Sequence, residues 1–435
     1  MKVAAPVWIW PKDARTPVQV GMLERDDATG ASLFHYDRGY VENGGMALDP
    51  DQLRHINARQ PIPIPANNRE GIPGIVADAG PDAWGRHVLT QELGYTPNSL
   101  EALIHSADDG SGNLCVGDLA SKPPIKELDL VDLAEALTRS QAGLTVKDGQ
   151  LQGILSPDTA LGGAKPKATV FADGHQWIAK YPERGDPFNL PYYEAAAMRM
   201  AGQLGIEVAT VKVKALSVDR SILLVKRFDR TPISAGGRYG FASAMTVLGV
   251  QAQVIGTARS YLHLAKRMRP WLRDQCDATL PKLWSRIAFN ALVANGDDHP
   301  RNHGFIKTDG QWQLSPAFDI VPTWIHRERL ALAMPFLMET ATRATSLVTA
   351  KNLIRAAPTF RITEETARLE LITMAQRILD EFSAVVRELD APASVNNELA
   401  PMHNWTSRIL SEATSLSPVD FGQAEKRRTR WKWSP

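Results

Sequence analysis

Cysteine is scarce in this sequence, with Cys115 and Cys276 the only two among 435 residues. Two isolated cysteines cannot build a disulfide framework, and they make no CxxC grouping for a metal. We therefore expect both thiols to be buried as small apolar groups in a reducing compartment.

Long apolar runs are also missing. No stretch approaches the ~20 apolar residues that a membrane helix needs, and the apolar stretch before Pro11 is too short for a signal peptide. We expect a cytoplasmic protein without membrane contacts.

Neither sign of charge is in excess, because 49 Lys and Arg face 48 Asp and Glu, for a formal net charge of +1. This balance gives no reason to expect nucleic acid as the main ligand. Hydrophobic residues make up 44% and charged residues 22%, as in ordinary globular proteins. A chain of this length exceeds one core, so two or three domains or lobes are expected.

Two nucleotide-binding motifs are absent. The sequence has no GxxxxGK[ST], which excludes a P-loop NTPase. The glycine-rich stretch Gly110 to Gly117 lacks the dinucleotide fingerprint and a βαβ context, and it is interpreted as a turn.

The order of predicted strands and helices along the chain indicates an α+β fold in three parts. These are an N-terminal subdomain of a β unit plus helices (1–125), a β-rich N-lobe (126–238) and a helical C-lobe (239–435). Strands are expected at 6–10, 17–23, 32–40, 168–172, 176–181, 208–216 and 221–228. Helices are expected from Pro81 to about Ser106 and at 128–140, 192–204, 261–268, 280–294, 349–357 and 364–389. Residues 141–156 are interpreted as a flexible link.

A dense polar stretch, residues 295–302 (NGDDHPRN), follows the apolar run 283–293. Such a cluster at the end of a buried helix is costly unless it binds something. A carboxylate followed five positions later by Asn is typical of the catalytic loop of protein kinases. Asp297 then serves as general base and Asn302 as metal ligand, although the adjacent Asp298 is a competing base. His299 is assigned either to holding the loop or to a phosphate contact.

Asp319 follows a predicted hairpin, 304–306 and 311–314 with its turn at Asp309-Gly310. A lone Asp between Phe and Ile on an apolar strand needs a cation or hydrogen-bond donors. Asp319 and Asn302 with phosphate oxygens would suit Mg²⁺. A zinc pair of His299 and His303 is an alternative, which Gly296 and Pro300 disfavour because they interrupt a helix.

A possible phosphate loop precedes the first strand of the N-lobe. Gly162 and Gly163 allow close backbone approach to an anion, and Lys165 and Lys167 add charge, although a plain hairpin turn would look the same. Lys180, at the end of the next strand, would pair with the α- and β-phosphates.

Two further N-lobe features fit the same nucleotide. Glu194 would orient Lys180, unless it is only a first-turn acid of its helix. The strand end Lys226-Arg227-Phe228 is the expected place for adenine, or else a charged surface strand end.

With these motifs in order, the chain resembles the HipA family of serine/threonine kinases, the toxin halves of bacterial toxin–antitoxin pairs. The resemblance also rests on 34–37 (FHYD), 80–86 (GPDAWGR), 161–167 (LGGAKPK), 225–230 (VKRFDR) and 314–320 (LSPAFDI). It implies a two-lobed kinase-like fold that uses ATP and Mg²⁺. The implied nucleotide contacts are Gly162, Gly163, Ala164, Lys165, Pro166, Lys167, Lys180, Lys226, Arg227, Phe228, His299, Asn302, Phe318 and Asp319.

The resemblance also implies biology. Known family substrates include aminoacyl-tRNA synthetases, whose modification arrests translation and growth and is linked to persistence. The usual partner is a HipB-like helix-turn-helix antitoxin, through which the toxin reaches operator DNA. Members with regulatory autophosphorylation carry Ser where this chain has Ala160, so Thr159 and Ser156 become the substitute sites.

Two alternatives stay open from the sequence. One is a kinase of a small-molecule hydroxyl acceptor on the same scaffold. The other is a non-catalytic co-repressor that an antitoxin brings to DNA, with the basic tail 425–433 near the phosphates.

Overall fold

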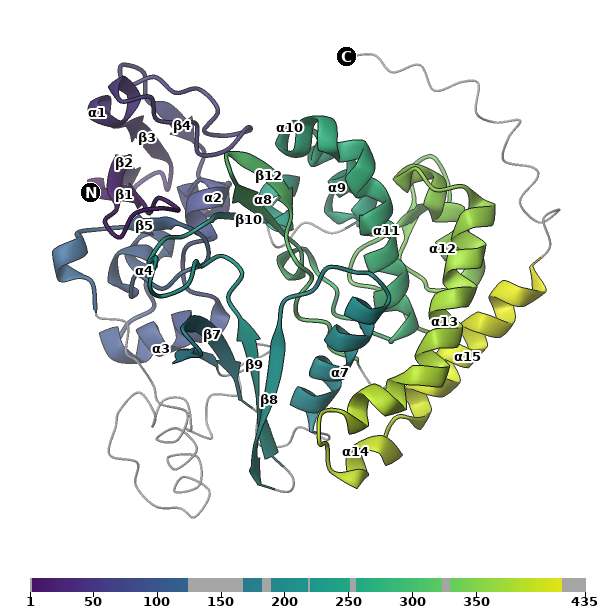
Figure 1. Cartoon of the computed structure of the whole chain (residues 1–435). Coiled ribbons are helices and arrows are strands. Elements are labelled where there is room, and N and C mark those ends of the chain that lie inside the picture. Colours follow the sequence, from purple (N-terminus) through teal and green to yellow (C-terminus); the bar gives the residue numbers. More distant parts are fainter. Residues whose placement is uncertain are drawn as a thin grey trace.

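The computed structural model describes residues 2–123, 167–181, 189–217, 220–250, 256–322 and 329–416. The fold is α+β, with a β-rich N-terminal side and a mostly helical C-terminal side (Figure 1). The predicted fold class is therefore confirmed. The predicted domain boundaries stay predictions, and the first of them falls outside the described ranges.

The N-terminal subdomain is built on an antiparallel five-stranded sheet in the order β4-β3-β2-β1-β5. Its strands are β1 (Lys2–Ile9), β2 (Val18–Asp26), β3 (Ser32–Tyr36), β4 (Ile62–Ile64) and β5 (Leu114–Val116). Burial alternates along β3, where Ser32, Phe34 and Tyr36 face the core. The interpretation of Gly110 to Gly117 as only a turn is wrong, because β5 lies within it and pairs with β1.

Helices α1 (Arg38–Glu42), α2 (Gly74–Ala77), α3 (Ala83–Leu93) and α4 (Ser99–His105) complete the subdomain. The predicted start near Pro81 is confirmed, since the Asp82 side chain accepts a hydrogen bond from Gly85 N and caps α3. Asn98 and Glu101 form a capping box on α4.

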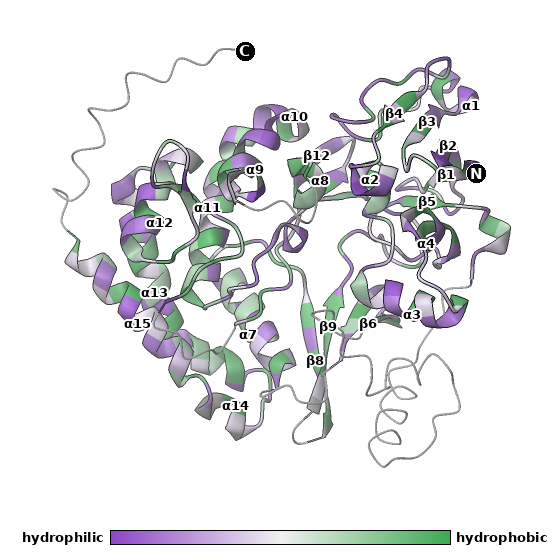
Figure 2. Cartoon of the chain, turned by 180° about the vertical axis from the view of Figure 1, so that it is seen from behind, coloured by the Kyte–Doolittle hydropathy of each residue, from purple (hydrophilic) through white to green (hydrophobic). Residues whose placement is uncertain are grey.

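The second sheet is antiparallel and runs β6-β7-β9-β8, with α7 (Leu190–Gln203) packed against β8 and β9. Its strands are β6 (Lys167–Ala172), β7 (His175–Lys180), β8 (Val211–Ser217) and β9 (Arg220–Lys226). Asp173 and Gly174 have φ of 51° and 72°, as a two-residue type I′ hairpin turn requires. Strands β6 and β9 carry mostly hydrophobic residues (Figure 2).

The C-terminal lobe consists of helices around a small antiparallel sheet, β10 (Gly240–Ser243), β11 (Gly304–Thr308) and β12 (Gln311–Leu314). Its helices are α8 (Ala244–Leu248), α9 (Tyr261–Arg267), α10 (Arg269–Leu272), α11 (Cys276–Leu292), α12 (Ala350–Ala356), α13 (Glu364–Arg387), α14 (Ala393–Asn397) and α15 (Ala400–Ser415). The antiparallel pair β13 (Leu337–Met338) and β14 (Ala344–Thr345) also belongs to this lobe. The predicted hairpin and helices at these positions are confirmed. Strand β10 and helix α15, which packs along α13, were not predicted.

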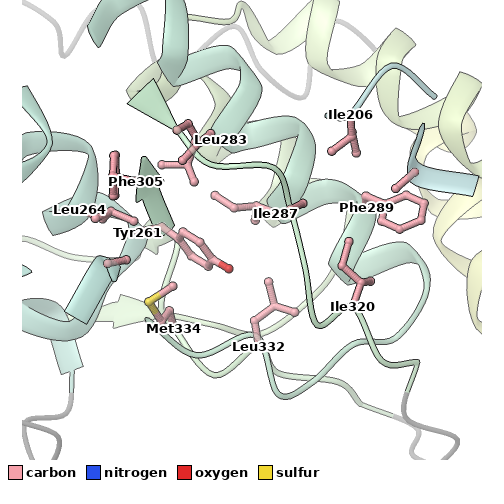
Figure 3. Packing of buried hydrophobic residues seen from close by; sticks show 14 of the residues in the cluster. Ile206, Tyr261, Leu264, Leu283, Ile287, Phe289, Phe305, Ile320, Leu332 and Met334 are labelled. Carbon is pink, nitrogen blue, oxygen red and sulfur yellow. The ribbon is translucent and has the colours of Figure 1, made fainter. Parts of the chain in front are cut away.

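The interior of the C-terminal lobe surrounds α11. Figure 3 shows Ile287 and Phe289 of this helix among side chains from other segments, including Tyr261, Leu332 and Ile320. All five are buried. No helix in the described ranges is long and apolar enough to cross a membrane.

A buried ionic cluster joins the N-terminal subdomain to the end of β9. We call it the hinge network; it consists of Asp108, Asp109, Arg227, Asp229, Arg230 and Arg238. Arg227 binds Asp109 at 2.6 Å and Asp229 at 2.8 Å. Arg230 binds Asp229 at 2.7 Å and donates to Gly110 O. The glycine-rich stretch is thus fixed by guanidinium groups of the neighbouring lobe.

Candidate active site

The end of α11 leads into residues 295–302, the predicted catalytic loop, which we call the catalytic loop below. Asn295 N donates to Asn290 O at 2.8 Å while Ala294 has a φ of 57°, which is the Schellman arrangement. Glycine usually occupies this position, but here it is Ala294. A left-handed backbone costs a non-glycine residue energy, and such residues cluster at functional sites.

The catalytic loop presents Asp297 and buries its neighbours. Asp297 is exposed, whereas Asp298 and Asn302 are buried. The Asp297 carbonyl accepts hydrogen bonds from His299 N at 2.8 Å and from Asn302 Nδ2 at 2.9 Å. Because the amide nitrogen of Asn302 is used to close the loop, its Oδ1 is the atom left for a ligand.

The Asp298 side chain is held by buried contacts within the protein. Its Oδ1 lies 2.7 Å from His303 Nε2, and the Tyr261 hydroxyl lies 2.9 Å from the same nitrogen. The backbone carbonyl of His303 accepts a hydrogen bond from Ala244 N, which joins the loop to α8. This arrangement favours Asp297 over Asp298 as the group that meets a substrate. Because His303 Nε2 is engaged, only the buried Nδ1 of His303 is left for the alternative zinc pair with His299.

Asp319 lies in an irregular segment after β12, so its predicted place on a strand is wrong. Its φ is 60°. The segment is held by Ala317, whose N donates to Glu207 O at 2.8 Å and whose carbonyl accepts Ala209 N at 2.9 Å. The buried Arg286 of α11 donates to Ser315 O.

Lys180 joins the two lobes. Its ammonium lies 2.6 Å from Glu194 of α7 and 2.5 Å from Asp319 of the C-terminal lobe. The predicted pairing with Glu194 is therefore present. Burial would lower the pKa of Lys180, but the carboxylates of Asp319 and Glu194 raise it above its usual range.

The charge of Asp319 is stabilised in return. Burial alone would raise its pKa, but Lys180 chiefly, with Lys167 and His299, lowers it. Lys167 and His299 therefore lie close enough to Asp319 to interact with its charge. Lys167, the first residue of β6, also pairs with Asp82 at the cap of α3.

An aromatic group lines the region beside Asp319. Phe228 and Phe318 have ring centroids 5.6 Å apart, and Phe241 lies 6.1 Å from Phe228 and 6.5 Å from Phe318. Two of these were predicted nucleotide contacts. Phe241 was missed, because β10 shows no motif and comes to this place only through pairing with β11.

The remaining predicted residues divide into three sets. The Arg227 side chain is engaged in the hinge network, and the predicted nucleotide contact of this residue stays a prediction. Lys226 ends β9 beside Trp177. The residues that lie outside the described ranges are Ser156, Thr159, Gly162, Gly163, Ala164, Lys165, Pro166 and the tail 425–433.

No group of three or more His, Cys, Asp or Glu side chains suited to a metal occurs among the described residues. The oxygens at hand are those of Asp319 and Asn302. In the part of the chain that the structure describes, the second oxygen of Asp319 and Oδ1 of Asn302 have no hydrogen-bond partner. Two unpartnered oxygen ligands suit a hard cation such as Mg²⁺, which takes few protein ligands.

Two family models match the chain. The HipA-like C-terminal domain matches residues 159–388, and the HipA N-terminal domain matches residues 14–117. The chain belongs to the HipA family.

The curated relatives of the chain are distant in sequence. The serine/threonine-protein kinase toxin HipA of Shewanella oneidensis is 22% identical over 354 residues, covering 73% of this chain and 76% of the toxin. Y4dM of Sinorhizobium fredii is 26% identical over 276 residues, covering 58% of this chain. The match spans only 62% of the length of Y4dM.

The fold of the HipA family is confirmed by a solved structure. S. oneidensis HipA, determined with HipB and its operator DNA, superposes with a TM-score of 0.67 and 18% identity. The match covers 93% of this chain and 96% of that one. The α+β kinase-like fold that the resemblance to the HipA family implied is therefore confirmed.

Proposed function

We propose that this protein is an ATP-dependent serine/threonine protein kinase that acts as a cytoplasmic toxin. The observation that carries the proposal is the placement of Lys180 between Glu194 and Asp319, with the exposed Asp297 on the adjoining loop. A lysine that pairs with a helix glutamate and reaches the metal-binding aspartate is the arrangement that kinases need for phosphoryl transfer.

Each residue has one role in this proposal. Lys180 binds the α- and β-phosphates, and Lys167 adds positive charge beside Asp319. Phe228 and Phe318 contact the adenine. Asp297 accepts the proton of the acceptor hydroxyl, which it must reach within a hydrogen bond. Asn302 Oδ1 and Asp319 would hold Mg²⁺, which neutralises phosphate charge during transfer.

The glycine loop completes the nucleotide site in this proposal. Gly162 and Gly163 allow the backbone to approach the phosphates, with Lys165 as an added charge. Autophosphorylation at Thr159 or Ser156 would regulate the same loop. These assignments rest on the sequence motif alone.

The toxin role and its partners are part of the proposal. The target would be a cytosolic protein, with an aminoacyl-tRNA synthetase as the first to test, and its modification would arrest translation and growth. A HipB-like antitoxin would neutralise the protein and bring it to operator DNA. Support comes from family membership and from the S. oneidensis relative, which was solved with HipB and DNA.

The test combines radiolabelled ATP with a lysate of the host cell. Wild-type protein with Mg²⁺ should transfer label to serine or threonine of a protein, which phosphoproteomics identifies. Lys180→Met and Asp319→Asn should each lower transfer by at least ~100-fold, because the first removes a positive charge from the phosphates and the second removes a ligand of the Mg²⁺ that would neutralise them. Arg343→Gln, a surface change far along the chain, is the control.

The outcomes separate the alternatives. Label in a small molecule with none in protein would replace the proposed acceptor. Equal labelling by wild type and Lys180→Met would contradict the assigned site. Growth arrest that survives in Asp319→Asn, with no transfer detected, would favour the co-repressor role.

A further inference from the structure

Four arginines from separate segments come together at the catalytic loop. We call them the cleft arginine group; they are Arg69 of η1 (Arg69–Gly71), Arg86 of α3, Arg259 at the end of η4 (Gly256–Arg259) and Arg301 of η6 (Pro300–Asn302). The kinase roles above use none of them.

Arg301 is the member within the catalytic loop. It lies four residues after Asp297 and directly before Asn302. Pro300 and Asn302 are buried on either side, whereas Arg301 is exposed. Within the described ranges no hydrogen bond or ion pair is found for its guanidinium. From sequence this arginine was indistinguishable from a solvated loop charge.

Arg69 reaches the loop from the N-terminal subdomain. Its guanidinium binds Asp78 at 2.7 Å and Gly74 O at 3.1 Å. Asp78 accepts Ser243 N at 2.6 Å and the Thr246 hydroxyl at 2.7 Å as well. Since η6 packs on β10 and α8, which carry Ser243 and Thr246, this cluster brings Arg69 close to the catalytic loop.

The backbone at Arg69 is unusual and supports a functional role. Arg69, Glu70 and Gly71 have consecutive positive φ values of 44°, 59° and 82°. A Cβ on Gly71 would lie 2.2 Å from Gly30 O, so only glycine fits there. Left-handed non-glycine residues persist where the surroundings fix them, often at binding sites.

Arg86 and Arg259 extend the group. Arg86 donates to the Ser99 hydroxyl at 2.7 Å and lies on α3, the helix whose cap Asp82 pairs with Lys167. Lys167 in turn acts on Asp319. The group is therefore adjacent to the residues proposed to hold ATP and Mg²⁺, without being part of them.

Two carboxylates lie beside this group: Asp78, which binds Arg69, and Glu70, which accepts a hydrogen bond from Ser99 N and interacts with Arg86. The pKa of Arg301 is lowered, first by partial burial and then by the charge of Arg69. Asp78 acts in the opposite direction, while Arg259 and Arg86 add to the lowering. Asp78 already binds Arg69 and two hydroxyl groups, and the described ranges show no ion pair for Arg301.

We infer that the cleft arginine group binds an anionic side chain of the peptide substrate next to the acceptor hydroxyl. The inference rests on the proposed kinase function and specifies its substrate class: serine or threonine segments with a carboxylate or phosphoryl group close by. Arg301 binds the anion, because its fork of N–H donors matches a carboxylate or phosphate. Arg69 and Arg259 supply the surrounding positive potential.

Binding can be measured without catalysis. We would use three series of fluorescent serine peptides, in which Glu, phosphoserine or Gln is placed at each position near the acceptor serine in turn. Each peptide is titrated with the full-length protein, and binding is followed by fluorescence polarisation. Wild type should bind the Glu and phosphoserine peptides about tenfold more tightly than the Gln peptide at one position or two. Glu and phosphoserine arms separate the two sources of negative charge.

Three variants sharpen the binding test. Arg301→Gln should remove the preference for an anion. Arg301→Lys should keep part of the preference for Glu but lose more of that for phosphoserine, because a lysine cannot bind phosphate through two nitrogens. Arg343→Gln, which alters an exposed pair with Glu339, should keep the full preference.

The same peptides are then phosphorylated with labelled ATP. An effect of Arg301→Gln on the KM for ATP, with no effect on peptide affinity, would overturn the inference by assigning the arginines to the nucleotide. Equal binding of Glu and Gln peptides by wild type would also overturn it. Anion-selective binding with no labelling of any peptide would instead contradict the proposed kinase function and leave the anion site standing.

Discussion

The exposed part of the loop 295–302 and the buried ionic layer of the hinge network use the same residue types in different ways. In the hinge network, Arg227 and Arg230 have side chains 4% exposed and are matched by Asp109 and Asp229. On the cleft, Arg301 is exposed and surrounded by other arginines. Neutralised charge in the interior holds parts together, whereas the exposed guanidinium of Arg301, which makes no ion pair within the described ranges, is available for a ligand.

The two adjacent aspartates repeat this difference within one loop. Asp298 is buried against His303 and Tyr261, while Asp297 reaches solvent. We therefore expect substitutions in the buried layer to reduce stability first, and substitutions on the cleft to reduce activity while the fold stays intact.

The largest expected effect is on the hinge network. Asp229→Asn should lower the free energy of unfolding by about 3–5 kcal/mol, because it leaves buried guanidinium groups without a counter-charge. Urea unfolding followed by circular dichroism measures this. Asp309→Asn is the matched control, since its pair with Lys12 is exposed and should contribute at most ~1 kcal/mol. Equal losses of unfolding free energy in Asp229→Asn and Asp309→Asn would contradict the distinction between buried and exposed ion pairs.

A smaller loss is expected for Asp298→Asn. The change keeps the shape but removes a charged hydrogen-bond acceptor from His303, which should cost about 1.5–3 kcal/mol in unfolding free energy. Phosphorylation should fall because the loop loses its anchor, and at low temperature, where the variant is folded, activity should partly return. If the stability of the variant matches that of wild type, Asp298 is not part of the buried layer.

The bridge across the cleft should respond to pH. The lowered pKa of Asp319 means that its contribution to stability is present above its ordinary value of ~3.9 and is lost as the pH falls through the lower folded value. Because the pKa of Lys180 is raised, the contribution of Lys180 to stability is present below its ordinary value of ~10.4 and is lost only as the pH rises above that value.

The corresponding measurement is the urea midpoint of wild type and Lys180→Met at several pH values. The difference in midpoint should be largest from about pH 7 to 9 and should shrink on acidification, because protonation of Asp319 removes the need for a counter-charge. A gap that stays constant down to pH 3 would mean that the lysine acts through packing alone.

Local spacing predicted the catalytic loop and the hairpins well. Asp297 and Asn302 lie within one loop, and the turns at Asp173-Gly174 and Asp309-Gly310 follow from local turn chemistry. Glu194 was found because it lies early in the helix after Lys180. The sequence therefore contained most of what decides the proposed chemistry.

Long-range contacts were not predictable in the same way. Tyr261 and Phe241 show no motif, and they join the site only through packing of α9 and pairing of β10. Strand β5 was missed because three residues carry little pattern. The bonds of Arg227 to Asp109 and Gly110 were not predicted, because these partners lie more than a hundred residues earlier. The strand assigned to Asp319 failed because positive φ at this aspartate is set by tertiary contacts.

The most direct test of the account compares Asp297→Asn with wild type in single-turnover phosphoryl transfer, with ATP affinity and unfolding free energy measured on the same samples. The account predicts a fall of about 10²–10⁴-fold in the transfer rate, as expected for loss of a general base, with ATP binding and stability unchanged. Transfer at the wild-type rate by Asp297→Asn would contradict the central claim that this aspartate is the base of a HipA-family kinase.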